Sequence, residues 1–255
     1  MFIDTHCHIS KEYYEDIDNL IKECNENNVK TLIISGCDKN SIIEGLEIIN
    51  KYSNIYMTIG FHPSEANITS EEELLWLEKL LTTNKKIVGV GEIGLDYYWV
   101  KDNKDKQRDL FKKQLDLATK LNLPVVIHSR DATQETYDIL KEYNLKGIIH
   151  CYSGSLEMAK EYVKLGYKIG IGGVLTFKNS NLKEVVKSID LENITLETDS
   201  PYLAPDPYRG KQNSPKYIPI IASKIAEIKE IDIELVKEIT TNTTNSLFDL
   251  KKTVW

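Results

Sequence analysis

The sequence predicts a (β/α)8 barrel, or TIM barrel, with extra helices at its C-terminal end. Eight short runs rich in β-branched residues alternate with longer amphipathic segments, which is typical of a parallel sheet covered by helices. Eight such units in 255 residues match the usual size of this barrel. A doubly wound open sheet is the alternative, but it usually has about five or six strands, and no G-x-G-x-x-G motif follows the first run.

The elements follow one another with a regular rhythm. The expected strands are residues 2–8, 31–35, 55–61, 87–92, 125–128, 147–150, 168–171 and 194–199. The helical patterns cover residues 12–27, 40–51, 71–81, 104–121, 133–143, 156–165 and 182–188, and two more at 215–229 and 233–245 close the chain. Because no linker or low-complexity tract interrupts them, we expect residues 1–255 to form a single domain.

Composition limits the classes of partner. The formal net charge of −7 provides no broad basic surface for duplex binding, although an enzyme that takes the end of one strand is compatible with it. No apolar run approaches the ~20 residues of a membrane span, and the N-terminus does not resemble a signal peptide. The cysteines show no paired spacing, which predicts reduced thiols. We expect a cytoplasmic monomer with no membrane association and no obligate protein partner.

The histidines share one position relative to the strands. His6 and His8 end the first expected strand, and period-2 alternation turns both rings to the same side. His62, His128 and His150 end the third, fifth and sixth strands. In a barrel, the carboxyl ends of the strands converge on one mouth, where active sites are built. A set of core or surface histidines would not be placed so regularly.

The strand ends carry enough ligands for two divalent cations. We expect His6, His8 and Asp199 to hold one, because the first and eighth strands are neighbours in a closed barrel. His128 and His150 would hold the other. Glu92, at the end of the fourth strand, would bridge the two. Mixed nitrogen and oxygen ligation favours Zn, Mn, Ni or Fe over Ca, and Mg is possible where carboxylate and water dominate.

Catalytic roles follow from this placement. Asp199 could both ligate metal and accept the proton of an attacking water, and Glu92 would share in catalysis by bridging. His62 is left free, so it could bond a phosphate oxygen or protonate the leaving group, or else cap the structure before Pro63. Glu197 lies deeper in the barrel, where we expect it to be the partner of a buried cation or ring N–H.

Several motifs together point to a known family. They are DTHCH from residue 4, GFHP from 60, GEIGLDY from 91, HSR from 128, HCYSG from 150, LETDSPYLAP from 196, RGKQN from 209 and NSLF from 245. In number and order they resemble the TatD family of metal-dependent deoxyribonucleases, within the amidohydrolase-like barrels. Tyr152 stands where phenylalanine is commoner in that family. The resemblance implies the same six metal ligands and an ester hydrolase whose usual substrate is DNA, with 3′ exonuclease action or deacylation of mischarged tRNA in some members.

Mouth loops supply the candidate substrate contacts. Arg130 and Arg209 carry guanidinium groups that suit phosphate oxygens. Aromatic rings on the same loops could stack on unpaired bases without reading their sequence, and they are Tyr97, Tyr98, Trp99, Tyr152, Tyr202 and Tyr208.

Three functions therefore compete. The first is a two-metal phosphodiesterase acting on DNA at single-stranded 3′ ends. The second is a metal-dependent amidohydrolase or deacylase, for example of aminoacyl-tRNA, because the barrel supports both chemistries. The third, a protein that only stores metal, fits poorly with a carboxylate placed among histidines around open coordination positions. Two arginines and several tyrosines at the mouth favour the first.

Overall fold

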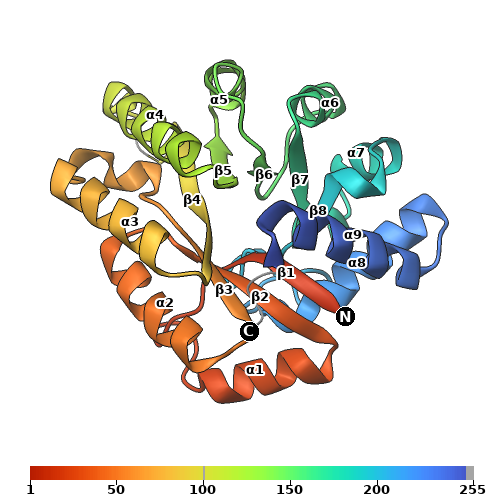
Figure 1. Ribbon diagram of the computed structural model, residues 1–255. Helices are drawn as coiled ribbons and strands as arrows, with labels where there is room; N and C mark the ends of the chain where they lie inside the picture. The colour runs from red at the N-terminus through yellow and green to blue at the C-terminus, as the bar shows by residue number, and fades with distance from the viewer. Residues whose placement is uncertain (100, 251–255) are drawn as a thin grey trace.

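The computed structural model describes residues 1–99 and 101–250. These residues contain one eight-stranded sheet in the order β1-β2-β3-β4-β5-β6-β7-β8, with every neighbouring pair parallel. The sheet rolls into a nearly closed barrel, and the helices surround it (Figure 1). The predicted (β/α)8 barrel is confirmed.

The elements alternate as expected. The strands are β1 Phe2–Cys7, β2 Val29–Gly36, β3 Ile55–Ile59, β4 Ile87–Asp96, β5 Val125–Arg130, β6 Gly147–Ile149, β7 Tyr167–Ile171 and β8 Ile194–Leu196. The helices are α1 Ile17–Glu26, α2 Lys39–Lys51, α3 Glu71–Thr83, α4 Lys104–Leu121, α5 Thr133–Leu140, α6 Leu156–Lys164, α7 Leu182–Ser188, α8 Ile218–Lys229 and α9 Ile233–Phe248. Short 3₁₀ turns are η1 Pro63–Asn67, η2 Gly173–Thr176, η3 Leu191–Asn193 and η4 Pro215–Tyr217.

The observed bounds differ from the expected ones at several places, among them one helix start and three strand ends. Helix α1 begins at Ile17 rather than at residue 12, because the Asp16 side chain accepts the Asn19 N–H and caps it there. Strand β4 continues to Asp96, whereas β6 and β8 end early, at Ile149 and Leu196. His150 and Asp199 therefore follow their strands instead of ending them.

The barrel interior is apolar at the end opposite the mouth. One residue from each of six strands packs there with Phe248 and Leu250 of the C-terminal segment: Ile3, Ile33, Tyr56, Val88, Val126 and Ile148. Side chains two or four positions further along a strand share its face. Glu92, His128 and His150 consequently point to the inside as well, nearer the mouth.

The seam between β1 and β8 is joined at the mouth end. The N–H of Asp199 donates to the His6 carbonyl at 2.9 Å, and the N–H of His8 donates to the Ser200 carbonyl at 2.7 Å. These bonds bring the two segments that carry His6, His8 and Asp199 side by side, as the neighbouring positions of the first and eighth strands predict.

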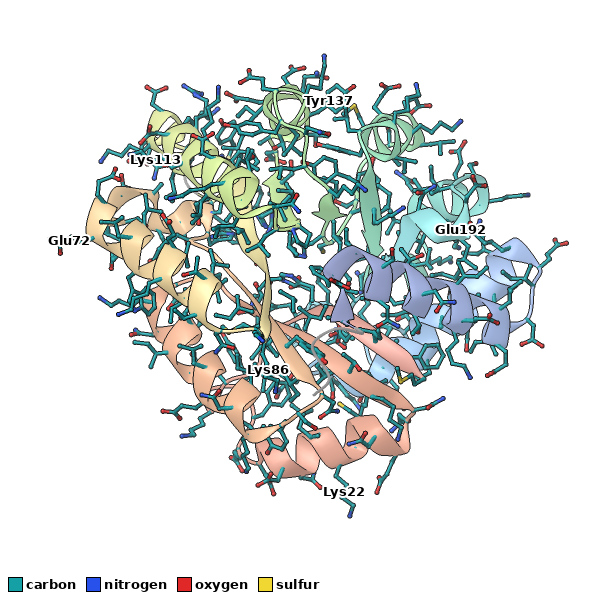
Figure 2. The ribbon with its side chains drawn as sticks, in the orientation of Figure 1. Lys22, Glu72, Lys86, Lys113, Tyr137 and Glu192 are labelled. Carbon is teal, nitrogen blue, oxygen red and sulfur yellow. The ribbon has the colours of Figure 1, made fainter. Side chains whose placement is uncertain are left out.

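The outer surface of the barrel is charged. Lys22, Glu72, Lys113 and Glu192 point away from the strands on the exposed faces of helices and turns (Figure 2). This is the ordinary pattern for amphipathic helices that cover a sheet. Within the described residues, no helix combines the length and the hydropathy needed to cross a membrane.

Candidate metal centre

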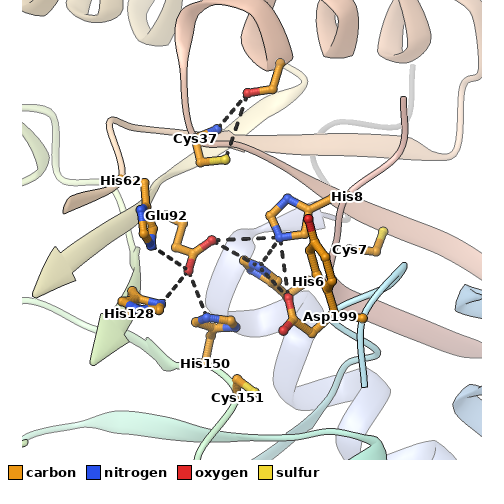
Figure 3. A network of polar contacts seen from close by, with 12 residues as sticks. His6, Cys7, His8, Cys37, His62, Glu92, His128, His150, Cys151 and Asp199 are labelled. Atoms are coloured by element: carbon orange, nitrogen blue, oxygen red, sulfur yellow. Dashed lines mark hydrogen bonds and ion pairs between the residues drawn. The ribbon is translucent and has the colours of Figure 1, made fainter. Parts of the chain in front are cut away.

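The six predicted ligands converge at the mouth of the barrel (Figure 3). Three of them lie in strands: His6 in β1, Glu92 in β4 and His128 in β5. The other three follow strands: His8 after β1, His150 after β6 and Asp199 after β8. Asp199 adopts a left-handed backbone conformation, with φ of 54°, which aspartate tolerates better than most residues. That turn directs the chain away from β8 while its carboxylate stays among the rings.

Glu92 divides its two oxygens between two pairs of histidines. Oε1 lies 2.8 Å from His128 Nδ1 and 3.0 Å from His150 Nε2. Oε2 lies 3.4 Å from His6 Nε2 and 3.9 Å from His8 Nε2. Asp199 Oδ1 joins the second pair, at 3.6 Å from His6 Nε2 and 3.4 Å from His8 Nε2. The structure thus brings all six predicted ligands together, with Glu92 between His6 and His8 on one side and His128 and His150 on the other. The two groups adjoin, because the His6 and His150 rings stack with 4.0 Å between their centres.

The donor set fits divalent cations. His6 Nε2 and His8 Nε2 lie only 3.2 Å apart, and both face carboxylate oxygens. Two imidazole lone pairs this close repel each other unless a proton or a cation lies between them. Groups of ligand atoms within 4.8 Å of one another are His6, His8 and Glu92; His6, His150 and Asp199; Glu92, His128 and His150; and His62, Asp96 and His128. Nitrogen and oxygen donors at such spacing are typical of Zn, Mn or Ni sites.

Charge is shared strongly within this cluster. Burial favours a neutral carboxyl, but the imidazoles of His150, His128 and His6 outweigh it and hold the pKa of Glu92 well below its ordinary value. The same opposition lowers the pKa of Asp199, where His8 is the main partner. Both carboxylates are therefore ionised at neutral pH, which is the form that binds metal.

The histidines respond in different directions. Burial disfavours the imidazolium, yet Glu92 and Glu197 outweigh it and raise the pKa of His150 well above its ordinary value. Burial is likewise outweighed at His8 by hydrogen bonding to Asp199 and Cys37, so the pKa of His8 is also raised well above its ordinary value. For His6, burial and the neighbouring His150 lower the pKa.

Two further carboxylates orient the rings from behind. Asp96 Oδ2 lies 3.1 Å from His128 Nε2, so the Nδ1 atom of that ring faces Glu92. Glu197 Oε1 lies 3.6 Å from His150 Nδ1, and the Cys151 N–H donates to it. Carboxylates in this position fix the tautomer and orientation of ligand histidines. Glu197 is where the sequence indicated a partner for a buried ring.

Sequence reasoning missed two of the supporting carboxylates. Asp96 lies four residues after Glu92 in the same strand, so period 2 could have placed both on one face. Asp4 lies two residues before His6; its Oδ1 accepts the N–H groups of His6 and Thr198, and its Oδ2 accepts the Thr198 hydroxyl at 2.5 Å. The sequence signal for Asp4 was a carboxylate within an apolar strand. Its hydrogen bonds hold the β1 and β8 segments together.

His62 faces the centre without joining the six. Its Nε2 lies 4.0 Å from Glu92 Oε1, and its Nδ1 contacts the Ser64 hydroxyl at 2.9 Å and accepts the Ser64 N–H. The ring therefore caps η1 and also lines the cavity, so both roles considered for it are compatible. Burial lowers the pKa of His62 to about 4, which leaves the ring neutral at pH 7.

A cavity of about 1230 Å³ opens above the centre. Four of the predicted substrate contacts line it: His62, Trp99, Arg130 and Tyr202. Tyr202 is half exposed, and its hydroxyl meets that of Tyr13 at 2.9 Å.

Five expected contacts do not line the cavity: Tyr97, Tyr98, Tyr152, Tyr208 and Arg209. The Tyr208 ring stacks on the Tyr217 ring, with 4.3 Å between their centres. Tyr97 is buried, and its hydroxyl donates to Glu135 Oε2 at 2.7 Å. Tyr152 is buried against Tyr162, and its hydroxyl donates to the Ser155 carbonyl. The expectation that these two rings stack on bases is corrected, because they pack the loops onto the barrel. Arg209 is exposed outside the cavity, with its guanidinium 4.3 Å from the Phe177 ring.

Comparison with known proteins decides the family. Residues 3–249 match the model of the TatD related DNases. The chain belongs to this family. The resemblance of its motifs is thereby confirmed, and the TatD family model covers nearly every element of the barrel.

Individual relatives match this chain over 97% of its length. The uncharacterized metal-dependent hydrolase YabD of Bacillus subtilis is 42% identical over 253 residues, which cover 97% of this chain and 99% of YabD. YJJV, a TatD homolog from Escherichia coli K12, has a similar crystal structure with a TM-score of 0.91, 30% identity and coverage of 97% of this chain and 98% of YJJV. A TatD family hydrolase from Entamoeba histolytica gives a TM-score of 0.88 at 28% identity, with 97% of each chain covered. The chain is therefore a member of a family of metal-dependent hydrolases.

Proposed function

We propose that the protein is a metal-dependent phosphodiesterase that hydrolyses DNA from single-stranded 3′ ends. The observation that carries this proposal is the division of Glu92 between two groups of histidines. A carboxylate that bridges two cations suits in-line displacement at phosphorus, where attacking and leaving oxygens both need positive charge. The family description, TatD related DNase, supports the same chemistry.

Each ligand has a place in the proposed centre. His6, His8 and Asp199 would hold one cation, His128 and His150 would hold the other, and Glu92 would be a ligand shared by both sites. Zn, Mn, Ni and Mg are the candidate ions, because they accept imidazole, carboxylate or water ligands. Once bound, such cations supply positive charge to phosphate oxygens and lower the pKa of a water molecule.

The remaining steps belong to side chains of this protein. Asp199 accepts the proton of the attacking water, and its lowered pKa keeps it ionised for that purpose. His62 is neutral and faces the cavity, so its Nε2 can hydrogen-bond the phosphate or the leaving oxygen. Arg130 lines the same cavity and binds a non-bridging phosphate oxygen.

End-labelled DNA tests the proposal directly. The metal-loaded protein should release mononucleotides from the 3′ end of a single strand and act more slowly on a blunt duplex. The double variant His6→Ala, His8→Ala should lose this activity together with bound metal, measured by elemental analysis. Hydrolysis of the ester of an aminoacyl-tRNA with DNA left intact would instead favour the deacylase alternative.

A further inference from the structure

An exposed aromatic surface lies at the edge of the cavity. We call it the Trp99 platform, and it consists of Tyr98, Trp99 and Arg130. Trp99 is 70% exposed and Tyr98 is 45% exposed, although both are large apolar side chains. The Arg130 Cζ lies 4.2 Å from the centre of the Tyr98 ring and 5.3 Å from that of the Trp99 ring. Trp99 and Arg130 line the cavity together with Glu92 and His128.

The platform is tied to the metal centre by one carboxylate. Asp96 Oδ1 accepts the backbone N–H groups of Tyr98 and Trp99, each at 2.9 Å. The other oxygen of Asp96 lies 3.1 Å from His128 Nε2. The Tyr97 N–H also donates to the Arg130 carbonyl at 2.9 Å. The backbone that carries the exposed rings is thus held next to a proposed metal ligand.

The platform offers one group for a phosphate and one for a base: the Arg130 guanidinium and the exposed Trp99 indole. Among the described residues, no carboxylate forms an ion pair with the Arg130 guanidinium, so its N–H groups can donate to phosphate oxygens. An exposed indole offers a flat apolar face to a base, but a base can stack there only if it is unpaired. The cavity wall over β2 and β3 instead carries several carboxylates, which disfavour phosphates on that side: Asp38, Glu44, Glu65 and Glu73. Lys39 also lines this wall, but its Nζ lies 3.8 Å from Glu73 Oε1, which offsets its charge.

We propose that the Trp99 platform binds an unpaired nucleotide next to the scissile phosphate, with its base stacked on Trp99 and its phosphate on Arg130. The platform would thereby select single-stranded ends over duplex. This inference rests on the proposed DNA hydrolysis, and it assigns that site a determinant of strand preference.

Variants of Trp99 combined with abasic substrates test this contact. Trp99→Ala should raise both KM and the Kd of a single-stranded oligonucleotide by about 5- to 150-fold, as expected for loss of one base stack. Trp99→Phe keeps a ring and should recover most of the loss. Leu75→Ala removes another exposed apolar side chain, outside the cavity, and serves as the control that changes neither constant.

An abasic scan then locates the base. One base at a time is omitted from the oligonucleotide, and at one position the penalty of Trp99→Ala should disappear, because the ring has lost its partner. An unchanged penalty at every abasic position, or a Kd unaffected by Trp99→Ala, would overturn the platform. Binding is also measured in the Asp199→Asn background. If the wild-type, metal-loaded protein binds DNA through Trp99 but does not hydrolyse it, the proposed function is refuted and the platform still stands.

Discussion

At the scale of single residues, the centre depends on how charge is shared among buried side chains. Glu92 and Asp199 are held ionised by histidines, and His8 and His150 are held protonated by these carboxylates. Protons thus occupy positions that a cation can take over. Metal binding must therefore compete with protons.

This competition predicts a pH dependence of metal affinity. The pKa values of His8 and His150 are raised well above the ordinary histidine value of ~6.5, so both rings stay protonated at pH 7. Metal binding must expel those protons. The metal affinity should therefore rise as the pH rises through these two pKa values. Calorimetry of the metal-free protein at pH 7, in buffers of different ionisation enthalpy, should show proton release. His62→Ala should leave the number of released protons unchanged, because His62 carries none at that pH. Binding without proton release would contradict the charge distribution described.

Asp199 is the residue that the chemistry should need most. Asp199→Asn keeps the shape of the side chain but loses its charge and its ability to accept a proton. We expect kcat to fall by at least ~10²-fold, the lower end of what a positioned base supplies, while binding of the DNA end changes far less. Single-turnover hydrolysis with parallel metal analysis measures both effects. Near-normal turnover with metal retained would mean that the proton goes to another group.

At the scale of elements, strand ends explain what the sequence could predict. Period-2 alternation and strand order suffice to group His6 and His8 with Asp199, and His128 with His150. They do not reveal that β6 and β8 stop early and turn through left-handed residues at Cys151 and Asp199. Those turns are set by long-range contacts, such as the bond from the Asp199 N–H to His6.

Loops were predicted less well than strands. An aromatic ring on a mouth loop can face the cavity or pack under the loop, and local sequence does not distinguish the two. Tyr97 and Tyr152 are buried by contacts with α5 and α6, whereas Trp99 and Tyr202 are exposed. Burial of such rings depends on contacts with helices that come later in the chain. A local sequence motif does not predict these contacts.

Strand β4 links the metal centre to its loop through Asp96. Asp96→Asn keeps an oxygen for the N–H groups of Tyr98 and Trp99 but removes the charge that faces His128. We expect metal affinity to fall by about 10- to 100-fold, the usual effect of losing such a partner. Competition with a chromophoric chelator measures this affinity. Asp96→Ala also removes the oxygen that accepts the N–H groups of Tyr98 and Trp99, so it should in addition weaken DNA binding. Equal DNA binding by both variants would show that the loop does not need this oxygen.

Helix α9 closes the apolar end of the barrel with Phe248. Its ring is buried in the apolar layer at the end of the barrel opposite the mouth, which we call the inner cluster. The inner cluster consists of Ile3, Ile33, Tyr56, Val88, Val126, Ile148, Phe248 and Leu250. Phe248→Ala should lower the free energy of unfolding by about 3–5 kcal/mol, because it opens a cavity in that layer. Urea denaturation measures the change. A loss within the ordinary range of surface substitutions, about 0.5 kcal/mol, would show that α9 does not seal the barrel.

At the scale of the whole molecule, an apolar layer and a polar mouth divide the barrel interior. The inner cluster fills one end, and the carboxylates and imidazoles gather at the other, beneath the cavity. Because the net charge is −7, we expect the attraction for a phosphate chain to come from Arg130 and from the cations proposed at the mouth. Activity should therefore follow metal occupancy closely.

A Mn²⁺ titration of the metal-free protein tests the bridged pair most directly. Electron paramagnetic resonance and hydrolysis of a single-stranded oligonucleotide are followed in the same samples. We predict two bound ions per chain that are magnetically coupled, with hydrolysis rising as the second ion binds. Glu92→Gln should remove both the coupling and the activity. Full hydrolysis with one ion per chain, or two ions that never couple, would contradict the bridging role of Glu92.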